Sequence, residues 1–211
     1  MKLLSATPSP YARKVRIALI EKALPFELVT EIPWNQDASA PRWNPLGKIP
    51  VLILDDGTAV YESRFILEYL ELKHPLPPLL PHDVDGILAA KRLEVLADGV
   101  CDAVVLSLLE GLRPPDRRSN AWVGRQRRKI DAGVAEIARL VRPDSAYANG
   151  TVFGLGDVAV GSMLGYLDLR FPQFDWRSAH PHLVTLFDRL GERPSFRATV
   201  PSAQTMPDEV A

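Results

Sequence analysis

The chain has a single cysteine, Cys101, among its 211 residues. One thiol cannot form a disulfide within the chain, so a disulfide framework is excluded. No apolar stretch approaches the roughly 18 residues that a membrane-spanning helix needs, and the first residues lack the apolar core of a signal peptide. These absences predict a soluble, cytoplasmic protein in which Cys101 has a packing role.

An excess of charge of one sign is also lacking, because 25 Lys and Arg residues face 26 Asp and Glu residues. The formal net charge of −1 gives no bulk attraction for nucleic acids or anionic lipids. The basic run Arg125–Lys129 has Trp122 as its only nearby aromatic residue and is followed by the acids Asp131 and Glu136. We interpret the run as a solvated helix face and predict neither a nucleic-acid partner nor a membrane partner.

The four histidines show no metal-ligand spacing. His180 and His182 are too close together to form a zinc pair by themselves. The sequence therefore predicts no metal site.

The hydrophobic content of 46% is sufficient for one large core or two modest ones. The first part of the chain mixes strand and helix patterns. Strands are predicted at 2–6 and 26–30, helices at 13–23 and from Ser63 to about residue 74, an irregular region at 34–43, and a hairpin over 51–61. Four prolines between 75 and 81 then make helix continuation unfavourable.

Beyond these prolines the patterns indicate helices only, over 83–112, 118–142, 157–170 and 181–192. The predicted fold class is α/β plus all-α. A βαβ-α-ββ-α domain covers 1–76, a linker 77–84, and an all-helical bundle 85–211. Within the bundle, Asp157 is expected to reach back to Gly154 as half of a capping box. Residues from about Pro201 are polar and aperiodic, and we expect them to fray.

The segment Ser9-Pro10-Tyr11-Ala12 opens the first predicted helix. In thioredoxin-like folds this turn carries the redox chemistry, and glutaredoxins have Cys-Pro-Tyr-Cys there. Since dithiol exchange needs two thiols, Ser9 and Ala12 exclude it at this position. A hydroxyl at the positive end of a helix is instead suited to stabilising the thiolate of a bound molecule.

Three motifs, in order, carry a family resemblance: Ser9-Pro10-Tyr11, the run Asn44-Pro45-Leu46-Gly47-Lys48-Ile49-Pro50-Val51-Leu52, and Tyr61-Glu62-Ser63. Over nearly its whole length the chain resembles the cytosolic glutathione transferases, and in particular bacterial members with a serine-type active site. The resemblance implies a thioredoxin-like N-terminal domain, a homodimer, and glutathione as co-substrate. The implied activity is detoxifying conjugation of glutathione to a small hydrophobic electrophile.

The resemblance implies that Ser9 donates a hydrogen bond to the glutathione sulfur. Lowering a thiol pKa near 8.5 by about 2 units needs roughly 2.7 kcal/mol. A hydroxyl donor supplies about 1.5–3 kcal/mol and a helix N-terminus about 0.3–1 kcal/mol. Ser9 can also be a simple N-cap, which would leave its hydrogen free. Tyr11 and then Thr7 are the rival hydroxyls.

The second and third motifs are expected to hold glutathione. The resemblance implies a cis Pro50, with Lys48 in contact with glutathione and the Ile49 backbone paired with its peptide backbone. The alternative is a trans Pro50 that starts a strand. Glu62 is expected to bind the ammonium group and Ser63 the γ-glutamyl carboxylate. The alternatives are a solvated charge at Glu62 and an ordinary N-cap at Ser63.

Asp98 and Asp102 lie one turn apart on a predicted helix, where transferases of this type line the acceptor pocket or reach the partner subunit's glutathione. The favoured interpretation of both is a solvated helix charge. Two other functions stay open: a non-catalytic glutathione-binding or regulatory protein, and a glutathione-dependent isomerase or dehalogenase.

Overall fold

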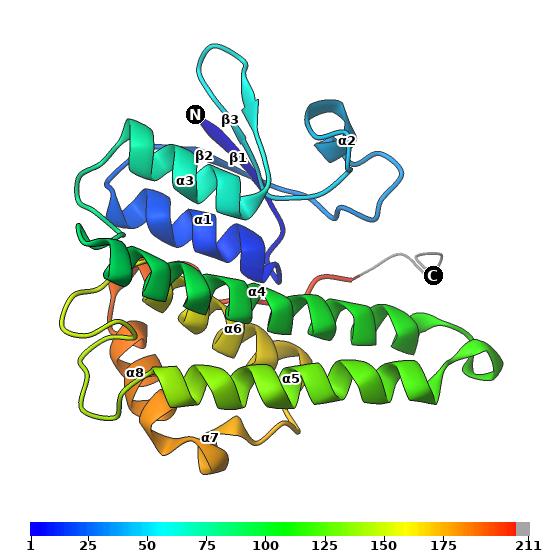
Figure 1. Ribbon diagram of the computed structural model, residues 1–211. Coiled ribbons are helices and arrows are strands. Elements are labelled where there is room, and N and C mark those ends of the chain that lie inside the picture. Colours follow the sequence, from blue (N-terminus) through cyan, green and yellow to red (C-terminus); the bar gives the residue numbers. More distant parts are fainter. Residues whose placement is uncertain (206–211) are drawn as a thin grey trace. The chain divides into compact units, whose positions relative to one another are not determined.

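The computed structural model describes residues 1–205 and divides into two compact units (Figure 1). The first unit contains Met1–Leu79 together with the segment that begins at Arg193, and the second contains Leu80–Glu192. The segment from Arg193 was included in the predicted helical domain, 85–211. It packs instead with the first unit, because its polar side chains bond to groups on the first helix of the chain.

A four-stranded mixed sheet forms the centre of the first unit. Its strands are β1 (Lys2–Ser5), β2 (Glu27–Thr30), β3 (Val51–Ile53) and β4 (Ala59–Val60), in the spatial order β2-β1-β3-β4. β1 runs parallel to β2 and antiparallel to β3, and β4 completes the predicted hairpin with β3. Leu4, Val51 and Ile53 form a buried apolar cluster on this sheet.

Helices α1 (Pro10–Glu21) and α3 (Ser63–Lys73) lie side by side below the sheet (Figure 1). The short helix α2 (Ala40–Trp43) falls in the region that the sequence indicated as irregular. Its N-terminus is capped from a distance, because the Glu31 carboxylate accepts hydrogen bonds from the backbone N–H groups of Ser39 and Ala40. A cap supplied from nine residues away leaves no local signal in the sequence.

The C-terminal end of α1 is fastened to the chain that follows α3. The buried Lys22 ammonium donates to the carbonyl oxygens of His74 and Pro77, at 2.8 and 2.9 Å, and pairs with Glu71 at 2.5 Å. These three contacts use all three N–H groups of the ammonium, which is how a fully buried lysine avoids an unpaired charge.

The second unit is helical. Its elements are α4 (Val84–Leu112), the 3₁₀ turn η1 (Pro115–Arg117), α5 (Asn120–Leu140), α6 (Leu155–Arg170), α7 (Trp176–Ala179) and α8 (Pro181–Gly191). The long helices match the predicted ranges within a few residues, whereas the four-residue helix α7 was missed. No helix of the described chain is both long enough and apolar enough to cross a membrane.

The core of the second unit is organised around α6 and α4. Every residue from Leu155 to Leu167 is buried, and α4 packs along both α5 and α6. At Gly133 on α5 a Cβ atom would lie only 2.4 Å from Val100 of α4, so glycine permits this close approach. Asp157 accepts from the Gly154 N–H at 2.9 Å, which confirms the predicted half of a capping box.

Candidate functional site

Ser9 is the N-cap of α1. Its Oγ accepts a hydrogen bond from the Ala12 N–H at 3.1 Å, and Pro10 occupies the first helical position. One lone pair of the hydroxyl oxygen is therefore engaged in the cap, while the hydroxyl hydrogen has no acceptor among the described residues. This is the arrangement expected of a donor at the positive end of a helix.

The two rival hydroxyls differ in their surroundings. The Thr7 hydroxyl donates to the carbonyl oxygen of Ser202 at 3.0 Å, so its hydrogen is already committed. Tyr11 is half-buried at the second position of α1. Residues 201–205 have no helix or strand, as expected, but they are not without contacts: Ser202 bonds to Thr7, and Gln204 donates to the Glu31 carbonyl oxygen at 3.5 Å. The rest of the expected fraying lies outside the described residues.

Asn44 organises the turn that leads to the predicted glutathione-binding backbone. Its side chain is buried, donates from Nδ2 to the Lys48 carbonyl oxygen at 2.8 Å, and accepts from the Leu46 N–H at 3.0 Å. Gly47 lies at φ +62°, a conformation that glycine adopts without strain. Asn44 was not among the predicted site residues, although an Asn-Pro dipeptide is a known turn signal.

The Ile49–Pro50 peptide bond is cis, which confirms the prediction made for Pro50. Pro50 is buried, and Ile49 packs half-buried against the Leu4 cluster of the sheet. Lys48, by contrast, is exposed, so its ammonium is accessible to a bound molecule. The second motif thus presents one exposed basic side chain next to a backbone segment that lies outside the strands, directly before β3.

The N-cap of α3 differs from the one expected at Ser63. Glu62, not Ser63, is the N-cap, because one carboxylate oxygen of Glu62 accepts from the N–H groups of Arg64 and Phe65, at 3.1 and 3.3 Å. Ser63 follows at the first helical position with 1% of its surface exposed. Its Oγ has no hydrogen-bond partner in the described part of the chain. A buried hydroxyl without a partner is costly in a folded protein, and Ser63 lies in the first turn of α3, where the N–H groups of the helix N-terminus favour an anion that could also accept from this hydroxyl.

Asp98 and Asp102 lie on α4, in the second unit. Asp102 is exposed, in agreement with the favoured interpretation as a solvated charge. Asp98 is only 3% exposed, so that interpretation is wrong for this residue. Sequence spacing placed both on one face of a helix but could not show which of them the neighbouring elements cover.

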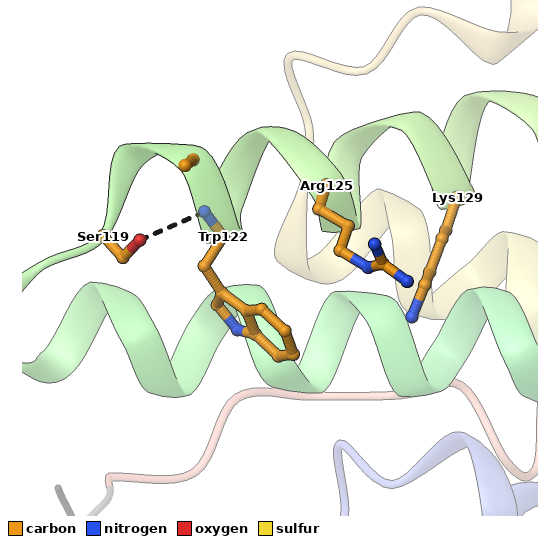
Figure 2. Close-up of a pocket in the computed structure, with 5 residues that line it drawn as sticks. Ser119, Trp122, Arg125 and Lys129 are labelled. Carbon is orange, nitrogen blue, oxygen red and sulfur yellow. Dashed lines mark hydrogen bonds between the residues drawn. The ribbon is translucent and has the colours of Figure 1, made fainter.

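A shallow groove on α5 is lined by Ser119, Ala121, Trp122, Arg125 and Lys129 (Figure 2). Ser119 caps the helix by accepting from the Trp122 N–H at 3.2 Å. Arg125 and Lys129 are exposed, as are Arg127 and Arg128, in agreement with a solvated basic face. None of the predicted site residues lines this groove. Among residues 1–205 no group of three or more histidine, cysteine or acidic side chains could hold a metal ion.

Two family models match the chain. Residues 8–73 match the glutathione S-transferase N-terminal domain, and residues 120–189 match the glutathione S-transferase C-terminal domain. The first match contains every predicted glutathione-binding residue and also Ser9.

Individual proteins match over the full length. A crystal structure of a glutathione S-transferase from Methylobacterium radiotolerans, in complex with glutathione sulfonate, superposes with a TM-score of 0.98 at 60% identity and covers 100% of this chain and 99% of that chain. The GST-like protein YibF of Escherichia coli is 37% identical over 95% of this chain and 98% of its own length. Maleylacetoacetate isomerase of Pseudomonas aeruginosa is 30% identical over 97% of both chains.

Proposed function

Because the chain belongs to the glutathione S-transferase family, we propose that it binds glutathione and transfers it, as the thiolate, to a small hydrophobic electrophile. The observation that carries the proposal is the Ser9 hydroxyl, whose oxygen caps α1 and whose hydrogen has no acceptor within residues 1–205. A sulfur anion placed there would receive that hydrogen bond and the field of the helix N-terminus together.

Three contacts are proposed for the glutathione peptide. Lys48 and the Ile49 backbone, next to cis Pro50, would bind its glycine end and its central amide. The first turn of α3 would bind its γ-glutamyl end, with the Ser63 hydroxyl and backbone N–H groups on the carboxylate and Glu62 on the ammonium group. The unpartnered Ser63 Oγ supports this assignment, as does the complex of the 60% identical transferase with glutathione sulfonate.

The proposal for the electrophile names a class of substrate and three candidate contact residues. Tyr11, Asp98 and Asp102 are the candidates for contact with the electrophile. Since a thiol substrate persists in a reducing compartment, the proposed location is the cytoplasm.

A second candidate function is glutathione-dependent isomerisation, which uses the same thiolate on a different acceptor. The 30% identity with maleylacetoacetate isomerase over 97% of both chains supports isomerisation as a candidate function. Without turnover on either kind of acceptor, the protein would be a glutathione-binding or regulatory member of the family.

Steady-state assays with glutathione and two sets of acceptors test the proposal. One set contains aryl and alkyl electrophiles, and the other contains cis-alkene diketo acids that isomerise after thiolate addition. We expect turnover with the first set and a decrease of about 10- to 100-fold in kcat for Ser9→Ala, because one hydrogen bond to a charged sulfur is lost. Glutathione affinity should change only a few-fold.

Turnover confined to the second set would favour the isomerase. An unchanged kcat in Ser9→Ala would move the donor role to Tyr11 or Thr7. No turnover with either set would favour the non-catalytic function.

A further inference from the structure

The C-terminal segment of the first unit is tied to α1 from Arg193 to Thr199. Arg193 and Ser195 bond to Glu21 at the end of α1, and Arg16 donates to the Ala198 carbonyl oxygen at 2.9 Å. The Arg13 guanidinium lies 5.3 Å from the centre of the Phe196 ring. These contacts direct the segment from the C-terminal end of α1 towards its N-terminal end, where Ser9 lies.

At the N-terminal end the segment bonds to Thr7 in both directions. The Thr7 hydroxyl donates to the Ser202 carbonyl oxygen at 3.0 Å, and the Ser202 N–H donates to the Thr7 carbonyl oxygen at 3.4 Å. Two reciprocal bonds between one pair of residues form a closed ring. We call this pair of bonds the Thr7–Ser202 strut.

The strut acts on the turn that presents Ser9. The Ser9 N–H donates to the Ala6 carbonyl oxygen at 3.1 Å, which closes a turn with Thr7 and Pro8 at its centre. Pro8 has no N–H group, so Thr7 supplies the only backbone or side-chain donors at the two central positions. Ser202 therefore bonds to the one residue at the centre of the turn that carries hydrogen-bond donors.

We infer that Thr7 is a positioning residue for the glutathione reaction: the Thr7–Ser202 strut holds the Ala6–Ser9 turn so that the Ser9 hydroxyl is aimed at the sulfur. This inference rests on the proposed function. A direct role of Thr7 as the sulfur donor is disfavoured, because its hydroxyl hydrogen already has an acceptor.

The Thr7 side-chain bond of the strut is exposed, so it competes with water and contributes little by itself. Its strength comes from the anchoring of the segment to α1, which keeps Ser202 close to Thr7 and lowers the entropy cost of forming the ring. A hydroxyl misplaced by about 1 Å loses much of its effect on a reacting atom.

Four variants distinguish a positioning role of Thr7 from a direct role as the sulfur donor. Thr7→Val removes the side-chain donor at nearly constant volume, and Thr7→Ser keeps it. Ser202→Pro removes the second N–H donor without touching Thr7. Thr151→Val, an exposed threonine of the second unit, is the control for the change from threonine to valine.

Two readouts are measured on the full chain. The first is amide hydrogen exchange in the absence of ligand, at Ser9 and Ala12, with Leu52 of β3 as the control for general loosening. The second is the pKa of the bound glutathione thiol, followed by thiolate absorbance, together with the glutathione Kd.

Thr7→Val and Ser202→Pro should each speed exchange at Ser9 and Ala12 by about 3- to 10-fold with Leu52 unchanged. Both should raise the bound thiol pKa by about 0.5–1 unit with Kd within about 2-fold. Thr7→Ser and Thr151→Val should match the wild type.

A raised thiol pKa in Thr7→Val alone, with Ser202→Pro like the wild type, would make Thr7 the sulfur donor and overturn the strut. Unchanged exchange at Ser9 and Ala12 would overturn it as well. If the wild type binds no thiolate, the proposed function fails, and the exchange measurement alone still decides whether the strut fixes the turn.

Discussion

Ser63 has a buried hydroxyl without a partner in the described chain, so its removal should affect ligand binding and not the stability of the free protein. Ser63→Ala should weaken glutathione binding by about 10-fold, since a hydrogen bond to a charged carboxylate is lost. The same change should leave the thermal stability of the free protein unchanged or slightly higher, because no protein bond is broken and an unsatisfied group is removed. Calorimetric titration and a melting curve measure the two effects.

Ser162 on α6 provides the matched control. Its Oγ is also buried and also lacks a partner within the described residues. Ser162→Ala should therefore share the effect on stability and have no effect on affinity. Equal glutathione affinity in wild type and Ser63→Ala would contradict the carboxylate assignment.

Single residues were predictable where a local pattern fixes the backbone. Ser9 before Pro10 indicated an N-cap, and the structure confirms it. The cap of α3 was assigned to Ser63 but belongs to Glu62, because either of two adjacent polar residues can take the extended backbone of an N-cap. The role of Asn44 depends on hydrogen bonds to both ends of a turn, which spacing alone does not reveal.

At the scale of an element, α1 is held at its C-terminal end by Glu21. Burial, which raises a carboxyl pKa, is outweighed by hydrogen bonds from Arg193 and Ser195 and by the charge of Arg193. The pKa of Glu21 therefore lies below its ordinary value of 4.5. A carboxyl pKa that is depressed in the folded state stabilises the protein above the unfolded-state pKa, and this contribution is lost as the pH falls.

Glu21→Gln should accordingly lower the free energy of unfolding by about 1–2 kcal/mol at pH 7, a value reduced for partial solvent exposure. The difference from wild type should shrink as the pH falls below 4.5, where the Glu21 carboxyl is protonated first in the unfolded chain, and should be lost once the pH has fallen through the lower pKa of the folded state. Urea unfolding at several pH values measures it, with the exposed Glu68→Gln as control. A difference that stays constant from pH 7 to pH 3 would rule out the ionised Glu21 as the source.

Elements with a long apolar period were predicted well. The helices α4, α5, α6 and α8 start and end within a few residues of the expected ranges. In α4, α5 and α8 several turns of periodic burial mark the helix, whereas α6 is buried on all sides from Leu155 to Leu167 and is marked by its long apolar run. The four-residue helices α2, α7 and α9 (Pro194–Arg197) were missed, since one turn carries no period and depends on remote contacts. The same reason explains why the segment around Ser202 was expected to fray.

At the scale of the whole molecule, the proposed state is a homodimer. Each unit exposes large apolar side chains on one helix: Phe65 and Leu72 on α3 are 54% and 77% exposed, and Leu88 and Val95 on α4 are 61% and 55% exposed. Such surfaces are typical of interfaces in oligomeric proteins. Sedimentation equilibrium should give about twice the 23.4 kDa of one chain, and Leu72→Glu should shift the distribution towards one chain. A single-chain mass for the wild type at micromolar concentration would contradict the dimer.

The order of a mixed α/β part followed by a helical part could be predicted from the change in pattern after the prolines at 75–81. The return of the last segment to the first unit could not, because it depends on Arg193 and Ser195 meeting Glu21 more than 170 residues earlier in the chain. Long-range pairs of this kind have no signature in a single sequence.

The central claim is that the protein holds glutathione as a thiolate. Calorimetric titration with glutathione at neutral pH, in two buffers of different ionisation enthalpy, measures affinity and proton release together. Since the free thiol has a pKa near 8.5, formation of a bound thiolate should release close to one proton per site. Binding without proton release, or no binding at all, would contradict the claim.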